Sequence, residues 1–195
     1  MTHLRRYLLL IFISLAVAPC RDGSGILLDY RVITRVTLVP GFQRQKVSMG
    51  VQGDMLYSLW VPSLIPSQKV PLVVALHYAG SGVPYQSEAY LQGLVQPALQ
   101  NLGAIIVAPD VPGDSWIDKN SEQAVMQFIA AAKEFWPVDP DKIVITGYSM
   151  GGIGTWYLAD KYPEVFWAAI PMASEPIGFL TGKVPHYVIQ GAKDE

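Results

Sequence analysis

Cysteine, histidine and charge are scarce in this sequence, and each shortage excludes a class of protein. Cys20 is the only cysteine among 195 residues, so no intrachain disulfide can form. Charged residues make up 15% and the formal net charge is −2, which leaves no basic surface of the kind that binds nucleic acid. Hydrophobic residues make up 51%, unlike the composition of disordered chains. A chain of this length is expected to form one globular domain.

The glycine patterns of nucleotide-binding proteins are also absent. The glycine-rich residues 147–154 do not spell G-x-G-x-x-G and do not follow the first strand of a βαβ unit. A P-loop would need a Lys-Ser/Thr pair after its last glycine, and none is present. Asp110, Asp114 and Asp118 share a loop but lack the spacing and the glutamate of an EF-hand. We therefore expect no cofactor and no metal ion.

The N-terminus has the features of an export signal. Arg5 and Arg6 precede an apolar run over residues 8–17, which is shorter than the stretch that a transmembrane helix needs to span the bilayer. An A-x-A cleavage pattern follows this run. The alternative is a lipoprotein box that ends at Cys20, through which the protein would be attached to a membrane. Either interpretation predicts an exported protein, secreted or periplasmic.

Apolar runs divide the remaining chain into strands and helices. Short strand-like runs at residues 45–51 and 55–61 are joined by a hairpin signal. Nearly continuous apolar runs follow at residues 70–76, 104–108, 143–146, 166–172 and 187–189. Continuous apolarity is typical of strands buried on both faces, as in a parallel sheet between helices. Helical spacing is found over residues 85–102, 121–136 and 151–162.

This alternation predicts an α/β fold with a mostly parallel, doubly wound sheet. We divide the chain into a signal peptide over residues 1–20, a linker and N-terminal extension over 21–38, and a domain over 39–195.

One serine stands in a pattern that combines a strand, a sharp turn and a helix. Residues 147–151 read Gly-Tyr-Ser-Met-Gly and directly follow an apolar run, which is the G-x-S-x-G nucleophile elbow. A side chain two positions before or after the serine would collide where the strand and helix cross, so glycine is favoured there. Ser149 is the predicted nucleophile, and Met150 would offer its backbone N–H to an oxyanion at the positive end of the helix.

The region around this serine resembles the α/β-hydrolase superfamily. It is most similar to secreted esterases of the polyhydroxybutyrate-depolymerase and feruloyl-esterase type and to related predicted peptidases. The similarity lies in residues 138–152 and continues to Pro163. Residues 76–80, Leu-His-Tyr-Ala-Gly, match the family's H-G-x-G segment except at Tyr78, where glycine is usual. The resemblance implies an α/β-hydrolase fold and a serine hydrolase that needs no cofactor.

The resemblance also implies roles for individual residues. Ala79 would donate a second N–H to the oxyanion hole beside Met150. Asp194 stands in a G-x-x-D segment and would orient the catalytic histidine, with Glu175 as a reserve acid. His77 is either the missing base or, as the segment match favours, a residue that shapes the loop below the oxyanion hole.

The order serine, acid, histidine requires a histidine after Asp194, and the sequence has none there. We expect the catalytic histidine beyond residue 195, and a domain that lacks its last strand and helix. His186 precedes the strand that Asp194 follows, so it is expected at the opposite end of the sheet. Trp116 either lines the acyl or alcohol pocket or covers the loop and core.

These residues predict a carboxylic ester hydrolase that acts through an acyl-enzyme on Ser149, with a small-molecule or polymeric ester as substrate. A serine peptidase of the same fold is an alternative. A second alternative is a binding module without turnover, which the missing histidine and the change at Tyr78 would explain.

Overall fold

The computed structural model describes residues 28–192, except residues 81 and 179. The predicted export signal, with Cys20 at its end, lies outside the described residues, and so does Asp194. Within the described part of the chain, no helix has the length and apolarity needed to cross a membrane.

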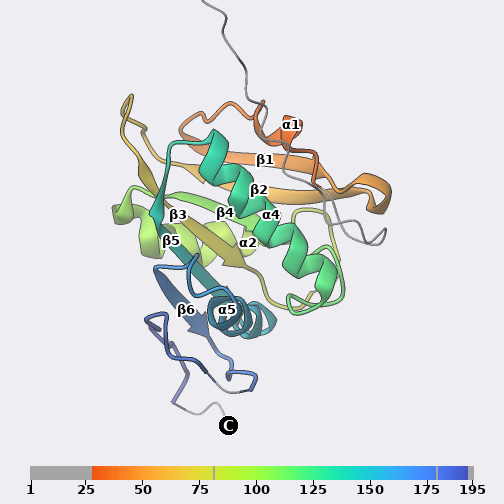
Figure 1. Cartoon of the computed structure of the whole chain (residues 1–195), viewed down its shortest axis with the longest axis vertical. Helices are drawn as coiled ribbons and strands as arrows, with labels where there is room; N and C mark the ends of the chain where they lie inside the picture. The colour runs from red at the N-terminus through yellow and green to blue at the C-terminus, as the bar shows by residue number, and fades with distance from the viewer. Residues whose placement is uncertain (1–27, 81, 179, 193–195) are drawn as a thin grey trace, which may run out of the picture.

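A six-stranded sheet forms the centre of the molecule, in the order β1-β2-β4-β3-β5-β6 (Figure 1). β2 runs antiparallel to β1 and β4, and the other neighbouring strands are parallel. The strands are β1 Gly41–Ser48, β2 Asp54–Val61, β3 Val70–Leu76, β4 Ile105–Pro109, β5 Val138–Tyr148 and β6 Ala168–Met172. The predicted mostly parallel sheet with a short antiparallel start is confirmed.

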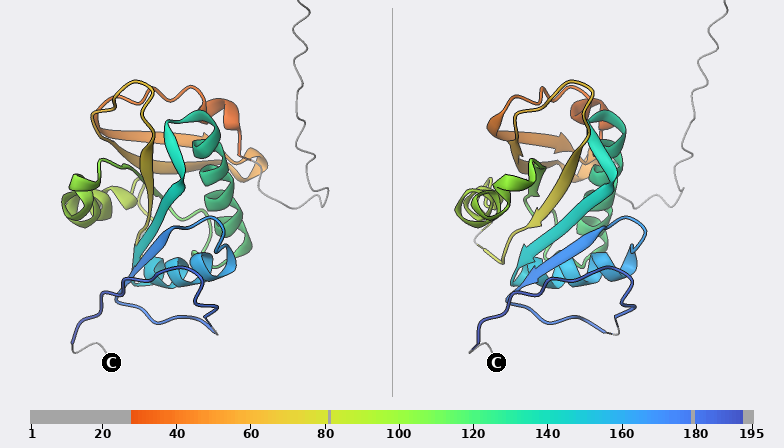
Figure 2. Two further views of the ribbon diagram at one scale, coloured as in Figure 1. Left: turned by 60° about the vertical axis from the view of Figure 1, so that its left-hand side comes forward. Right: turned by 90° about the vertical axis from the view of Figure 1, so that its left-hand side faces the viewer.

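Helices cover both faces of this sheet (Figure 2). α4 (Lys119–Phe135) and α5 (Met150–Lys161) lie on one face. The helical segment that follows β3 lies on the other face and consists of α2 Ser87–Tyr90, the π-helical η2 Leu91–Val95, α3 Gln96–Leu99 and the 3-10 turn η3 Gln100–Leu102. Two short elements near the start of the described chain are α1 Tyr30–Ile33 and the 3-10 turn η1 Gly50–Gln52.

The central strand β3 shows why a continuous apolar sequence produces this layered fold. Leu72, Val74 and Leu76 belong to the core that contains residues of α4 and α5. Val73 and Ala75 belong to the second core, which contains residues of η2. Successive side chains of a strand point to opposite faces, so each face of the sheet has its own apolar layer.

The helix predicted over residues 85–102 is interrupted. Pro97 has no N–H to donate to the carbonyl of Gly93, four residues earlier. The backbone next to it forms the π-helical turn η2 and then resumes as α3. The segment therefore covers the sheet as several short helical pieces instead of one long helix.

Two stretches near the ends of the described chain differ from what the sequence predicts. The predicted strand at residues 187–189 is absent, and isolated parallel bridges join His186 to Ala169 and Ile189 to Met172 instead. At the other end, Leu28 and Ile33 of the predicted linker are buried in the core with α4. The boundary between linker and domain itself stays a prediction.

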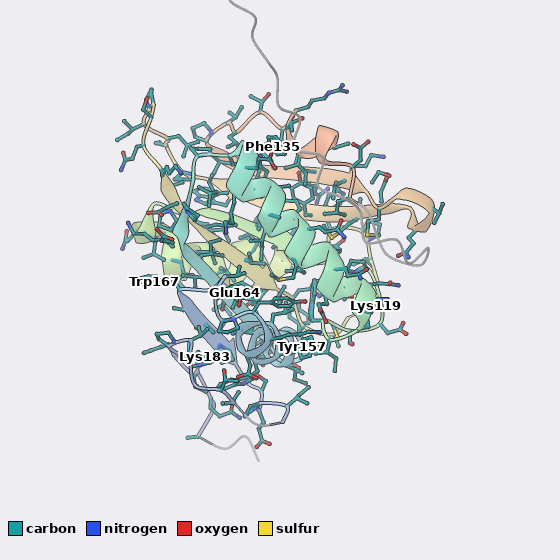
Figure 3. The ribbon with its side chains drawn as sticks, viewed as in Figure 1. Lys119, Phe135, Tyr157, Glu164, Trp167 and Lys183 are labelled. Atoms are coloured by element: carbon teal, nitrogen blue, oxygen red, sulfur yellow. The ribbon has the colours of Figure 1, made fainter. Side chains whose placement is uncertain are left out.

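A carboxylate joins α4 to α5. Glu122 is 8% exposed and accepts hydrogen bonds from the Tyr157 hydroxyl at 2.6 Å and the Lys161 ammonium at 2.7 Å. The Tyr162 hydroxyl also donates to it. Burial raises the pKa of Glu122, but these hydrogen bonds outweigh burial and leave the pKa below its usual range. Figure 3 shows Tyr157 on α5 near the Lys119 end of α4. The cluster holds α5 against α4.

Candidate active site

Ser149 occupies the sharp turn between β5, which ends at Tyr148, and α5, which begins at Met150. Its backbone dihedrals are φ 55° and ψ −116°, a conformation that is strained for a residue with a side chain. Hydrogen bonds hold the turn: the Ser149 N–H donates to the Met172 carbonyl at 2.9 Å, and the Ile153 N–H donates to the Ser149 carbonyl at 3.0 Å. This is the backbone geometry of a nucleophile elbow.

The glycines on either side of Ser149 are required by close backbone contacts. A Cβ at Gly147 would lie 2.1 Å from the carbonyl oxygen of Gly151. A Cβ at Gly151 would lie 1.8 Å from the carbonyl oxygen of Leu76, the last residue of β3. The collision expected from the sequence is therefore present at both positions. As a result, the first turn of α5 is pressed against the end of β3.

The two predicted oxyanion donors line one pocket of about 290 Å³. Met150 reaches it from the first turn of α5, where helical N–H groups lack intrahelical partners and the helix dipole is positive. Ala79 reaches it from the exposed loop after β3. The remaining lining residues are His77, Gly80, Gly82, Gln86, Val111, Gly113 and Asp114. Ala79 and Met150 thus line the same pocket, and Met150 directly follows Ser149 in the chain.

Tyr78 stands where the resembling proteins have glycine, and its ring packs between two other tyrosines. The ring meets Tyr148 edge to face with 6.1 Å between the centroids, and it meets Tyr90 in the same way at 6.5 Å. The backbone of the next residue, Ala79, still lines the same pocket as Met150. The larger side chain is accommodated beside the pocket.

His77 is buried under the loop, with only 2% of its surface exposed. The Val111 N–H donates to its Nε2 at 3.0 Å, which places the ring proton on Nδ1, and Nδ1 donates to the Tyr78 carbonyl at 2.6 Å. Burial lowers the pKa of His77, so the ring is neutral. Both ring nitrogens are engaged away from Ser149, as expected of a histidine that shapes the loop.

Trp116 lies beneath this loop and has no exposed surface. Its indole N–H donates to the His77 carbonyl at 2.8 Å, and the two rings meet edge to face at 5.2 Å. A Cβ at Gly154 of α5 would lie 2.4 Å from Cβ of Trp116. The predicted substrate contact through Trp116 is not supported by this position, because a completely buried side chain presents nothing to a ligand. Its position fits the alternative, a tryptophan that covers loop and core.

The candidate acids follow β6. Glu175 is exposed three residues after the end of β6. Asp194 lies outside the described residues, but the stretch that leads to it is described. The Ala173 N–H donates to the Ile189 carbonyl at 2.9 Å, and Ile189 and Gly191 line a pocket with Tyr148. This stretch therefore passes the carboxyl end of β5, where Ser149 stands.

His186 lies far from the serine turn. It forms a bridge with Ala169, which pairs with Ile145, four residues before Ser149. At about 3.3 Å per residue this bridge is about 13 Å along the strand from the turn. The His186 ring stacks on Trp156 with 4.6 Å between the centroids. It is a packing residue, in agreement with the expectation from the sequence.

Carboxylates near the pocket are used to organise the loop after β4. Asp118 caps α4, since Oδ1 accepts from the Ser121 N–H at 2.9 Å and Oδ2 accepts from the Ser115 N–H at 3.0 Å. Among the described residues, no group of three or more His, Cys, Asp or Glu side chains is arranged to hold a metal ion.

Gln86 also contacts this site, and it belongs to none of the motifs found in the sequence. Its side-chain amide donates to the Tyr78 carbonyl at 3.1 Å and accepts from the Gly82 N–H at 3.1 Å. The contact joins the turn before α2 to the loop after β3, and no local sequence pattern signals such a pairing.

Comparison with known proteins finds similar chains among hydrolases. The profile of the prolyl oligopeptidase family matches residues 91–177. Poly(3-hydroxyalkanoate) depolymerase C of Paucimonas lemoignei is 31% identical over 134 residues, which cover 64% of this chain and 32% of that protein. An acetylxylan esterase of Coprinopsis cinerea is 28% identical over 130 residues, which cover 60% of this chain and 34% of that protein. A crystal structure of a thermostable esterase superposes with a TM-score of 0.63 at 24% identity, over 78% of this chain and 55% of that one.

The matched part of this chain spans about a third of the length of these two curated relatives. The residues that the prolyl oligopeptidase profile matches include the serine turn and α5. Sheet order, the strained serine between β5 and α5, and the superposition on the esterase together show an α/β-hydrolase fold.

Proposed function

We propose that this protein is a serine hydrolase that cleaves carboxylic esters through an acyl-enzyme on Ser149. The observation that carries the proposal is the strained serine between β5 and α5, directly before Met150, whose pocket also contains Ala79. A serine held in this conformation at the start of a helix has its hydroxyl lifted above the sheet. The energetic cost of the strain is expected where function requires it.

In the proposed mechanism, the Ser149 hydroxyl attacks the ester carbonyl carbon and its proton passes to a histidine base. The N–H groups of Met150 and Ala79 stabilise the negative oxygen of the tetrahedral intermediate. The histidine then protonates the departing alcohol, and the acyl group remains on Ser149 until water hydrolyses it. Asp194 is the proposed acid that orients the histidine.

The base is proposed to come from outside the described residues. His77 and His186 are the described histidines, and both are held elsewhere, as shown above. The order of the triad places the base after Asp194 in sequence. The mechanism uses only backbone donors and ionisable side chains, so it requires no cofactor.

The choice of an ester as substrate is supported by relatives named as an acetylxylan esterase and a poly(3-hydroxyalkanoate) depolymerase. A peptide is the second candidate, because the matching family profile is that of prolyl oligopeptidases. Both substrates would use the same acyl-enzyme on Ser149. We further propose export through the signal over residues 1–20, with attachment through Cys20 as the alternative.

A fluorophosphonate probe and a short-chain aryl ester test the proposal on the protein expressed from its native reading frame. We expect covalent labelling and ester hydrolysis, and in Ser149→Ala we expect no labelling and a kcat lower by on the order of 10⁶-fold. Ser63→Ala, in the exposed loop before β3, is the matched control and should label normally. Unchanged turnover in Ser149→Ala would refute the nucleophile, and an unlabelled parent would favour a binding module.

A further inference from the structure

The carbonyl of Tyr78 accepts hydrogen bonds from two side chains. His77 Nδ1 donates to it at 2.6 Å, and the Gln86 side-chain amide donates to it at 3.1 Å. This carbonyl belongs to the same peptide group as the N–H of Ala79. A trans peptide group is planar, with its C=O and N–H pointing in opposite directions. Fixing the direction of the Tyr78 carbonyl therefore fixes the direction of the Ala79 N–H.

Gln86 also holds the far side of the same loop. Its Oε1 accepts from the Gly82 N–H at 3.1 Å, so one amide group bonds to the loop on both sides of Gly80. A Cβ at Gly80 would lie 1.9 Å from Nε2 of Gln86. The loop can close around the amide only because residue 80 has no side chain.

Gln86 is itself held in place by the sheet. Asp110, the residue directly after β4, accepts from the Tyr85 N–H at 2.6 Å through Oδ2 and from the Ser87 N–H at 2.9 Å through Oδ1. The backbone is therefore fixed on both sides of Gln86. The remaining donor to Tyr78, His77, is likewise fixed by the Val111 N–H. Both donors to the Tyr78 carbonyl thus stand on residues tied to the end of β4.

We propose that Gln86 is a positioning residue that aims the Ala79 N–H at the oxyanion formed on a Ser149-bound substrate. This inference rests on the proposed function and deepens it. Gln86 lines the pocket, but its amide bonds to Tyr78 and Gly82, so we assign it a role through the peptide group between Tyr78 and Ala79. An oxyanion donor is needed most in the transition state, so its orientation controls kcat more than substrate binding.

The test compares Gln86→Ala and Gln86→Glu with the parent protein. Alanine removes the bonds to Tyr78 and Gly82 and the 3.2 Å contact of the amide nitrogen with His77 Nδ1, whereas glutamate keeps an acceptor for Gly82 and loses the donor to Tyr78. Loss of one oxyanion donor costs about 10²–10³ in kcat, so misdirecting Ala79 should lower kcat about 10- to 100-fold with KM within about threefold. Gln92→Ala and Gln92→Glu are matched controls, because the Gln92 side chain is exposed on η2 and donates to Glu88 on the same helical segment.

The NMR chemical shift of the Ala79 amide provides a readout that does not depend on turnover. We expect this shift to change in both Gln86 variants, because the peptide group between Tyr78 and Ala79 loses a hydrogen bond at its carbonyl, and to stay the same in the Gln92 variants. A kcat within twofold of the Gln92 controls, or a loss confined to KM with an unchanged Ala79 shift, overturns the proposal. A parent protein without Ser149-dependent turnover contradicts the proposed function instead, and the Ala79 shift then decides the role of Gln86.

Discussion

Replacing Gly151 by alanine tests how tightly α5 is pressed against β3. The new Cβ would lie 1.8 Å from the Leu76 carbonyl oxygen, whereas real Cβ atoms stay at least 3.0 Å away, so the two must separate by at least about 1.2 Å. The obstacle is backbone at the end of a buried strand and cannot rotate aside. We expect a loss of about 1–3 kcal/mol in the free energy of unfolding, typical of overpacking, and a Tm several degrees lower.

The same displacement would move Met150 away from Ala79. A misplacement of about 1 Å can cost about 10²-fold in rate, so Gly151→Ala should lose ester hydrolysis well beyond its loss of stability. Gly93→Ala is the matched control, because a Cβ there meets nothing within 4 Å and the residue is exposed. Thermal unfolding and kcat/KM measured on both variants test whether the close contact of α5 with β3 supports stability and activity. A Gly151→Ala protein that unfolds within 1 °C of the Gly93→Ala control, with activity within about twofold, would refute the packing argument.

Two further predictions concern ionisable groups. Glu122→Gln should lower the free energy of unfolding by about 1.5–3 kcal/mol, the range for hydrogen bonds to a charged group, while exposed Glu134→Gln on the same helix should change it little. Folding lowers the pKa of Glu122, so its charge stabilises the folded protein above the unfolded pKa of about 4.3, and this stabilisation is lost as the pH falls through the folded pKa. In urea unfolding at several pH values, the free energy of unfolding of Glu122→Gln should therefore depend less on pH than that of the parent protein. Folding also lowers the pKa of His77, chiefly by burial, so stability should fall as the pH drops below about 6.5. NMR titration of His77 with an apparent pKa of 6.5 or above would contradict its burial as a neutral ring.

The serine turn was predictable because every part of it is local in sequence. Residues 147–151 carry the glycines that the crossing of β5 and α5 requires, and the strand before Ser149 is a continuous apolar run. The parallel sheet was predictable for a similar reason, because strands buried on both faces appear in the sequence as continuous apolar runs. Pro163 likewise marked the end of the helix after the serine, which stops at Lys161.

The features that the sequence did not reveal depend on contacts between distant residues. The sequence alone does not show whether Trp116 lines a pocket or packs under a loop. Its complete burial and its bond to the His77 carbonyl distinguish the two roles. Gln86 is an ordinary polar residue until the loop after β3 closes around it. The apolar run at residues 187–189 predicts a strand, but only isolated bridges to β6 form.

The bond from the Ser149 N–H to the Met172 carbonyl has a consequence for folding. The strained turn cannot persist by itself, because its conformation costs about 1–3 kcal/mol and must be held by surrounding structure. That structure includes the parallel pairing of β5 with β3 and β6, which joins segments far apart in the chain and forms slowly. The conformation proposed to make Ser149 a nucleophile therefore forms late, once the parallel strands have paired, so a partly folded or misregistered chain would lack the proposed activity.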